Sequence, residues 1–395
     1  MSSVLGALAW RFGQPRVVGQ IVAGILLGPS VLGRLPGHLT SRLFPHAALA
    51  PINVLAQVAI VFFMFAVGYE LEWVTLRGRH RAPLLVAGAA LVVPMGLGIG
   101  AATLLRSQFA AVGQAHFGRP FLLFMGVAVS ITALPVLAAI LRERGMTRTT
   151  AGVTATAAAG IMDVVAWLVL AGALVRSAHQ RPWWLSLLLI AAFAAVMLLA
   201  VRPLLRWALN WYGTAYQLPV AVMLALGSAW VTATLGLHPV FGAFLAGLTM
   251  PRQDPALLRP LQDLGQVLLP LFFIATGLST NIGALNGSAF AVLGIVCAIA
   301  VAGKIGPGYL GSRLGGLDRK DAATVSVLVG TRGLTELIVL NVGLATGVIV
   351  PRLFSVLVLM ALVTTIITAP LLSLIRAPSN QTSGELPAKP VEPVR

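Results

Sequence analysis

A succession of apolar runs, most of them about 20 residues long, constrains this chain more than any other feature. An α-helix of about 20 apolar residues crosses the roughly 30 Å hydrocarbon core of a bilayer. Hydrophobic residues make up 58% of the chain and charged residues 10%, whereas soluble domains carry about 25% charge. We therefore predict an all-α integral membrane protein with about 12–13 transmembrane helices. The runs are 2–12, 17–33, 52–71, 83–105, 121–141, 150–175, 183–201, 217–235, 238–250, 262–280, 288–312, 321–346 and 352–375.

The two ends of the chain depart from this pattern. The first run reaches only about 16 Å, so either the sequence starts inside a longer helix or this helix lies partly in the membrane interface. The end from Ala377 to Arg395 has four Pro and no apolar run, and we expect a disordered tail over 379–395. Residues 1–378 are then expected to form a single transmembrane unit.

Basic residues are distributed unevenly between the runs. With the N-terminus outside and all thirteen runs crossing, the inner loops hold 18 Lys and Arg and the outer loops hold 7. Because basic loops stay on the cytoplasmic side, this count places the C-terminus in the cytoplasm. Topology thus explains the net charge of +16, and we expect a lipid bilayer as partner and no nucleic acid. The 24 Arg against 3 Lys indicate a GC-rich genome and a bacterial plasma membrane.

Two pairs of segments repeat in the same order. Gly19–Pro29 resembles Gly242–Pro251, and Phe62–Gly68 resembles Leu271–Gly277. If runs 1–6 and 8–13 are two copies, these pairs occupy the second and third places of each copy. The odd seventh run, about 183–202, is then a linker helix that inverts the second copy. Inverted repeats of this kind are a transporter architecture.

The fifth place of each copy contains a helix interruption. In Ser130–Pro135 the proline ring clashes with the carbonyl of Ile131 and has no N–H to donate. The twelfth run contains Gly330–Glu336, with two Gly and two charges. Freed backbone groups in a membrane need partners such as hydroxyls, water or an ion, so two crossed broken helices point to a midplane site. The alternative is an ordinary kink and a flexible Gly pair. The residues expected to support the breaks are Pro135, Gly330, Thr331, Arg332, Gly333 and Glu336.

Asp163 and Lys304 each stand alone in an apolar run. A charge at the bilayer centre costs roughly 2.5–3.5 kcal/mol, so its retention indicates an ion or proton path. A carboxylate in a narrow cavity holds either a proton or a monovalent cation, and this competition couples two fluxes. We predict that Asp163 binds both the proton and the transported metal cation, with Ser130 and Thr132 as oxygen ligands and Lys304 as charge partner.

Taken together, these motifs resemble the monovalent cation:proton antiporter-2 family over roughly residues 10–376. The resemblance implies a homodimer that exchanges K⁺ or Na⁺ for H⁺ without a cofactor, by an elevator-like motion. It implies a scaffold of about 1–71 and 217–280 and a mobile core of about 83–176 and 288–376. The sequence departs from the family at Met162, where members place Asp, Asn or Gln before the functional Asp. The motifs that carry the resemblance are Gly19–Gly33, Ser130–Pro135, Ile161–Trp167, Gly242–Pro251, Leu271–Ile282, Lys304 and Thr331–Leu337.

Three features of the sequence allow two interpretations each. Arg332 and Glu336 are four residues apart and face the same way on a helix, either as a self-neutralising support or as direct participants in transport. One titrating Asp exchanges one proton for one cation, which is electroneutral, whereas proton release from Lys304 as well would make exchange voltage-sensitive. His238 is a candidate pH sensor, although an interfacial packing role is favoured.

Other functions fit the sequence less well than cation exchange. A proton-coupled exporter of an organic cation or drug is the main alternative, because Met162 makes the site less hydrophilic. The sequence contains no run resembling a selectivity filter that would indicate a channel. The sequence contains no metal-ligand cluster, nucleophile elbow or phosphate loop that would indicate an enzyme.

Overall fold

The computed structural model describes residues 2–34, 36, 39–70, 81–178, 183–213, 216–235, 237–252 and 258–375, and these residues form helices and connecting segments without strands. The predicted tail, 379–395, lies outside the described residues. The helices are α1 (Ser2–Arg11), α2 (Arg16–Leu27), η1 (Leu32–Arg34), α3 (Leu39–Leu43), α4 (His46–Glu70), α5 (Arg81–Leu104), α6 (Arg106–Ala111), α7 (Arg119–Ser130), α8 (Leu134–Glu143), α9 (Thr150–Ala178), α10 (Trp183–Ala195), η3 (Val196–Val201), α11 (Arg202–Tyr212), α12 (Gln217–Thr234), α13 (Pro239–Thr249), α14 (Arg259–Leu278), η6 (Ile282–Ala284), α15 (Gly287–Leu314), α16 (Arg319–Leu328), α17 (Leu334–Ala345) and α18 (Pro351–Ile375).

The helices reproduce the predicted pattern of apolar runs. Within the described residues, ten helical segments have the length and hydropathy to cross a membrane, and α13 and α17 are apolar but shorter. The runs at 121–141 and 321–346 are each divided into two helices, α7–α8 and α16–α17. The first run forms α1, which has only 10 residues. The prediction of an all-α membrane protein with two interrupted helices is confirmed.

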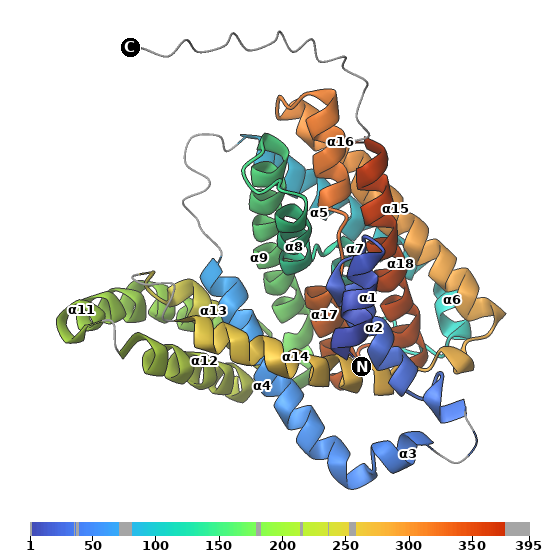
Figure 1. The fold of residues 1–395 in the computed structure, drawn as a ribbon, viewed down its shortest axis with the longest axis horizontal. Helices are drawn as coiled ribbons and strands as arrows, with labels where there is room; N and C mark the ends of the chain where they lie inside the picture. The colour runs from blue at the N-terminus through green and yellow to red at the C-terminus, as the bar shows by residue number, and fades with distance from the viewer. Residues whose placement is uncertain are drawn as a thin grey trace, which may run out of the picture.

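The helices pack in two groups. One group contains α1, α2, α4, α12, α13 and α14; α2 packs on α14, and α4 packs on both α13 and α14. The other contains α5, α7–α9 and α15–α18, which stand side by side as a bundle in the upper part of Figure 1. The groups contact each other where α18 packs on α2. The segments α10 and η3, which belong to neither group, contact α9 of one group and α13 of the other.

Glycine allows two close helix contacts in the first group. A Cβ atom on Gly277 of α14 would lie 2.0 Å from the carbonyl group of Gly24 on α2. Likewise, a Cβ on Gly247 of α13 would lie 2.0 Å from the carbonyl oxygen of Phe65 on α4, one turn from Gly68. In the repeat seen in the sequence, Gly24 corresponds to Gly247 and Gly68 to Gly277. Small residues allow membrane helices to pack backbone to backbone, and here they do so reciprocally between the repeated segments.

The two helix interruptions meet inside the second group. The backbone N–H of Ala133, between α7 and α8, donates to the carbonyl of Thr331, between α16 and α17, at 2.9 Å. The broken helices therefore cross at their breaks, and backbone groups freed in one break are satisfied by the other.

Candidate ion-binding site

The first break is an extended segment between two half-helices. Ile131 and Ala133 have extended backbone angles, and Pro135 falls in the first turn of α8, where its missing N–H costs nothing. The hydroxyl of Thr132 donates to the carbonyl of Val329 in the other break, at 2.7 Å. Ser130 is also buried, but its hydroxyl donates to Val127 within its own helix, at 3.2 Å.

The second break depends on a glycine conformation. Gly333 precedes α17 with φ of 152°, a region that residues with a Cβ rarely adopt. A Cβ here would also lie 2.6 Å from Cγ2 of Val136 on α8. The N–H groups of Gly330 and Thr331 close the end of α16 through the carbonyls of Val327 and Leu328, at 3.1 Å each. The break is therefore shaped to fit against the first one.

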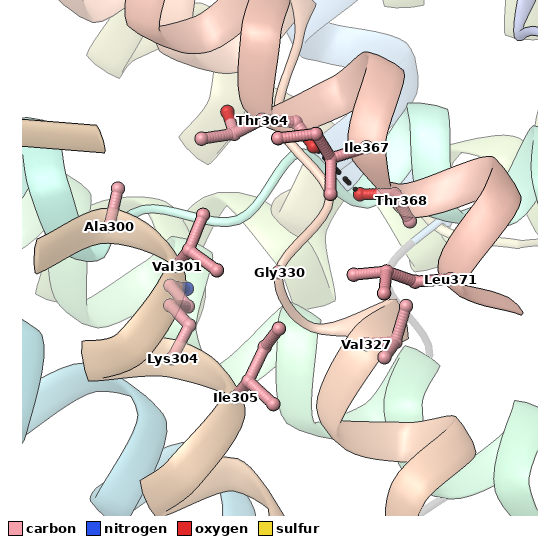
Figure 2. Close-up of a pocket in the computed structure, with 10 residues that line it drawn as sticks. All are labelled: Ala300, Val301, Lys304, Ile305, Val327, Gly330, Thr364, Ile367, Thr368 and Leu371. Atoms are coloured by element: carbon pink, nitrogen blue, oxygen red, sulfur yellow. Dashed lines mark hydrogen bonds between the residues drawn. The ribbon is translucent and has the colours of Figure 1, made fainter. Parts of the chain in front are cut away.

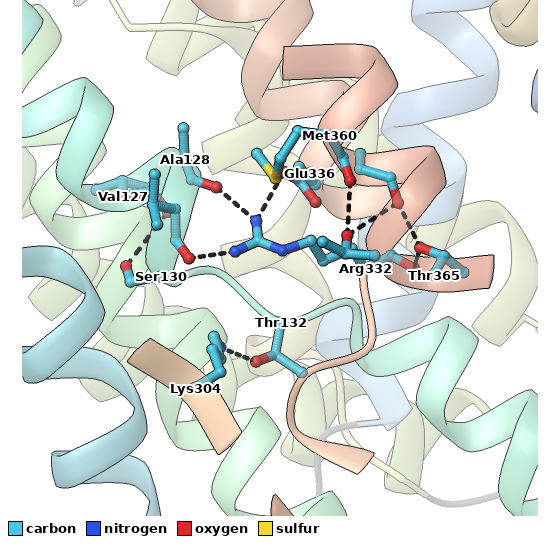
Figure 3. Close-up of polar contacts among 12 residues, drawn as sticks. Val127, Ala128, Ser130, Thr132, Lys304, Arg332, Glu336, Met360 and Thr365 are labelled. Carbon is cyan, nitrogen blue, oxygen red and sulfur yellow. Dashed lines mark hydrogen bonds and ion pairs between the residues drawn. The ribbon is translucent and has the colours of Figure 1, made fainter. Parts of the chain in front are cut away.

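Arg332 and Glu336 form a buried ion pair, with Arg332 Nη1 at 2.7 Å from Oε1 of Glu336 and neither side chain exposed. The same guanidinium donates to the carbonyls of Ala128, at 2.7 Å, and Val129 at the end of α7 (Figure 3). A cation there complements the negative end of the helix dipole. The predicted pairing is confirmed, and Arg332 also caps the opposite half-helix. The second carboxylate oxygen of Glu336 has no hydrogen-bond partner in the described residues.

Asp163 and Lys304 are both fully buried. Both carboxylate oxygens of Asp163 lack a hydrogen-bond partner among the described residues. The ammonium of Lys304 donates to the hydroxyl of Thr132 (Figure 3) and lies 3.9 Å from the sulfur of Met162, the residue before Asp163. In the described part of the chain the two residues form no direct ion pair.

A small cavity lies beside Lys304. It is bounded by α15, α18 and the break before α17, with Gly330, Thr364 and Thr368 on its walls (Figure 2). Its volume of about 20 Å³ is enough for a single water molecule. Lys304 therefore has room for a polar partner besides Thr132 and Met162.

Sequence reasoning missed two contacts around this site. Trp167 lies one helical turn after Asp163, its indole N–H is buried without a described partner, and its ring meets that of Phe241 on α13 edge to face at 5.3 Å. Asn341 of α17 donates to the hydroxyl of Thr276 on α14 at 3.0 Å. The spacing of four from Asp163 is a signal that could have identified Trp167, but no sequence pattern joins Asn341 to Thr276.

Two broken helices cross beside a buried carboxylate that has no hydrogen-bond partner among the described residues, and this arrangement within a membrane helix bundle is typical of secondary transporters. Comparison with known families agrees: the family "Sodium/hydrogen exchanger, transmembrane" matches residues 1–375. The chain belongs to this family, which confirms the antiporter family predicted from the motifs, and the family is one of transporters rather than enzymes.

Curated relatives extend the comparison. The Na⁺/H⁺ antiporter NhaS4 of Synechocystis sp. is 36% identical over 383 residues, covering 94% of this chain and 93% of that protein. Cation/H⁺ antiporter 19 of Arabidopsis thaliana is 37% identical over 93% of this chain and 47% of that protein. K⁺/H⁺ antiporter 1 of Saccharomyces cerevisiae is 33% identical over 92% of this chain and 43% of that protein. The chain therefore spans about half the length of the plant and yeast relatives.

A solved structure shows the same fold. The sodium proton antiporter MjNhaP1 from Methanocaldococcus jannaschii superposes with a TM-score of 0.62 at 14% identity, covering 95% of this chain and 94% of that one.

Proposed function

We propose that this protein exchanges a monovalent cation, K⁺ or Na⁺, for H⁺ across the membrane by alternating access. The observation that carries the proposal is Asp163, fully buried with neither oxygen hydrogen-bonded in the described part of the chain. A buried carboxylate without partners is costly while it is charged. It therefore needs either a proton or a cation, and taking one excludes the other.

The residues around Asp163 bind the cation, balance its charge or keep the two breaks in shape. Thr132, which already joins the two breaks, and Ser130 supply oxygen ligands, because hard cations prefer oxygen. Lys304 balances the charge of Asp163 from its position on Thr132 and Met162. Pro135, Gly330, Thr331, Gly333 and the Arg332–Glu336 pair keep the breaks in shape; these contacts support a structural role for the pair.

The larger motion is assigned to the two helix groups. We infer a scaffold of about 1–71 and 217–280, a mobile core of about 83–176 and 288–376, and a linker helix of about 183–202. The reciprocal contacts of Gly24 with Gly277 and of Gly247 with Gly68 support two inverted repeats and a scaffold held together by them. An elevator-like core movement would break the Asn341–Thr276 hydrogen bond. We also propose a homodimer in a bacterial plasma membrane with a cytoplasmic C-terminus.

The names of some relatives favour an inorganic cation over the organic cations considered above, because those names specify exchange of Na⁺ or K⁺ with H⁺. An organic substrate would have to compete with K⁺ or Na⁺ for Asp163. Flux measurements with an organic cation and K⁺ or Na⁺ present together distinguish the two kinds of substrate.

The test measures proton flux by fluorescence dequenching in proteoliposomes, with K⁺, Na⁺, Li⁺ and choline added in turn. Asp163→Asn cannot alternate between proton and cation, so dequenching is expected to fall to the level of empty liposomes for every cation. Asp263→Asn, at an exposed acid on α14, is the matched control and should exchange normally. Full exchange by the Asp163 variant would refute the assignment.

A further inference from the structure

One end of the linker helix extends beyond the length that a bilayer core requires. The segments α10, η3 and α11 hold 13, 6 and 11 residues, and the backbone stays helical at the junctions Ala195 and Val201. This continuous helix is about 45 Å long, against a hydrocarbon core of about 30 Å. The first two segments contain no charged residue and Arg202 begins α11, so α11 is the part that emerges into the headgroup region. It lies at one side of the molecule in Figure 1.

The side chains of α11 fall on three faces. At 100° per residue, Arg202 and Arg206 share one face with Asn210, while Trp207 and Trp211 share the next. The two indole rings stack at 6.4 Å and are 59% and 75% exposed. Tryptophan with basic residues is the composition of a helix at the membrane interface.

The third face lines an apolar groove of about 340 Å³ between α11 and α12. Its walls are Leu205, Ala208 and Leu209 of α11, Tyr216, and Val220 of α12. The groove is open rather than enclosed, and Tyr216 is 58% exposed. A groove of this kind accepts an acyl chain beside a headgroup bound by the polar face.

The sequence on either side of α11 carries no acidic residue over a long stretch. The sequence contains no Asp or Glu from Val164 to Gln253, and in the described part of the chain neither Arg202 nor Arg206 makes an ion pair. The charges of Arg206 and Arg252 both act on Arg202, whose Nε is buried without a described partner. Like charges four residues apart on a helix repel, so a bound anion would stabilise this arrangement.

Arg252 is held in place by the scaffold. Its Nε donates to the carbonyl of Tyr69 at 2.9 Å, and its guanidinium lies over the ring of the same residue at 5.5 Å. These contacts fix the orientation of one cation of the cluster before any ligand arrives, which lowers the cost of binding.

We propose that Arg202, Arg206 and Arg252, with the groove between α11 and α12, bind an anionic phospholipid. The phosphate lies on the arginines, an acyl chain lies in the groove, and the two tryptophans anchor the helix at the interface. The loop charges place this end on the cytoplasmic side, where anionic lipids attract basic segments. The site binds the end of the linker helix to the membrane, away from Asp163.

The experiment is native mass spectrometry of the full chain in detergent, titrated with phosphatidylglycerol or with phosphatidylcholine of identical acyl chains. The parent protein is expected to retain phosphatidylglycerol preferentially. Two arginines at a membrane surface account for roughly a 30-fold change in affinity, so the double variant R202Q/R206Q should weaken retention by about that factor. The control R148Q/R319Q, which removes two exposed arginines elsewhere, should bind like the parent.

A second variant tests the groove separately. Ala208→Phe leaves every arginine in place and fills the space for the acyl chain, so it should weaken phosphatidylglycerol retention without changing the charge; it also decides the matter if R202Q/R206Q does not fold. Four results overturn the proposal: equal retention of the two lipids, unaltered binding by the variants, displacement of the lipid by inorganic phosphate, or a variant that loses its dimer instead of its lipid. The last result would make this face a contact between copies of the chain.

Discussion

Replacing Arg332 by Gln is expected to destabilise the protein more than any other single loss at the crossing. The guanidinium bonds to Glu336 at 2.7 Å, to Ala128 at 2.7 Å and to Val129. Removing one partner of a buried ion pair costs about 3–5 kcal/mol, and each buried carbonyl left unpaired costs about 1–3 kcal/mol more. We therefore expect Arg332→Gln to lower the free energy of unfolding by at least about 5 kcal/mol.

Replacing the acid of this ion pair should cost less than replacing the base. In Glu336→Gln, Arg332 keeps its bonds to the two carbonyls, and the new amide oxygen can still accept from Nη1, so a loss of about 1–3 kcal/mol is expected. The double variant R332Q/E336Q has no stranded carboxylate. It should therefore be more stable than Arg332→Gln alone, although it contains one more substitution.

A double-mutant cycle measures this coupling. Unfolding of the purified protein in mixed micelles of dodecylmaltoside and SDS, followed by tryptophan fluorescence, gives the free energies. The exposed Arg352→Gln is the control and should change them by no more than about 0.5 kcal/mol. If the losses of the two single variants simply add in the double variant, the stranded-carboxylate reasoning is wrong.

Three further predictions address the second break, a histidine and the transport cycle. Gly333→Ala should lower the melting temperature markedly, because φ at this position is 152° and the alanine Cβ would meet Val136. Gly330→Ala should lower it much less, and equal losses in the two variants would contradict this reasoning. Burial lowers the pKa of His238 to about 4, below its unfolded value near 6.5, so protonation favours the unfolded state and stability should fall as the pH drops from about 6.5 to 4. In His238→Asn, which keeps a cap for Val240, that part of the fall should disappear, and the transport profile above pH 7 should not move; a shifted profile would make His238 a sensor. Finally, the exchange rate in proteoliposomes should not follow an imposed potential, and a rate that does so rejects one-for-one exchange.

The fold was predictable because its signals are local. Apolar runs long enough to cross a bilayer, Pro135 in one run and the Gly330–Gly333 pair in another give the helices and their breaks without knowledge of tertiary contacts. The pairing of Arg332 with Glu336 was equally accessible, since four residues make one helical turn. The close packing of Gly24 on Gly277 was not predicted, because the repeated segments show similarity but not which segment contacts which.

The arrangement within the site was not predictable from the same signals. Periodicity gives the face of a helix, but it does not give the residue that faces it from a distant segment. Lys304 contacts Thr132, which is 172 positions away, and Met162, which is 142 positions away. Asn341 and Thr276 are 65 positions apart on different helices. Such contacts follow from how the half-helices cross, which depends on many weak packing terms together.

The position of Lys304 bears on the stoichiometry. Two acids and two bases, Asp163, Glu336, Lys304 and Arg332, are buried at the crossing, so their charges cancel when all are ionised. The site has the same net charge with a proton on Asp163 as with one monovalent cation beside the ionised carboxylate. The proton-loaded and the cation-loaded steps of the transport cycle then move equal charge across the membrane. Only loss of the proton from Lys304 would make the legs unequal. Because the ammonium is held by the hydroxyl of Thr132 and the sulfur of Met162, a cation can reach Asp163 without taking a carboxylate partner from Lys304. If Asp163 binds the cation as proposed, Met162 offers no second carboxylate or amide beside it, and we expect an exchange in which the lysine stays charged.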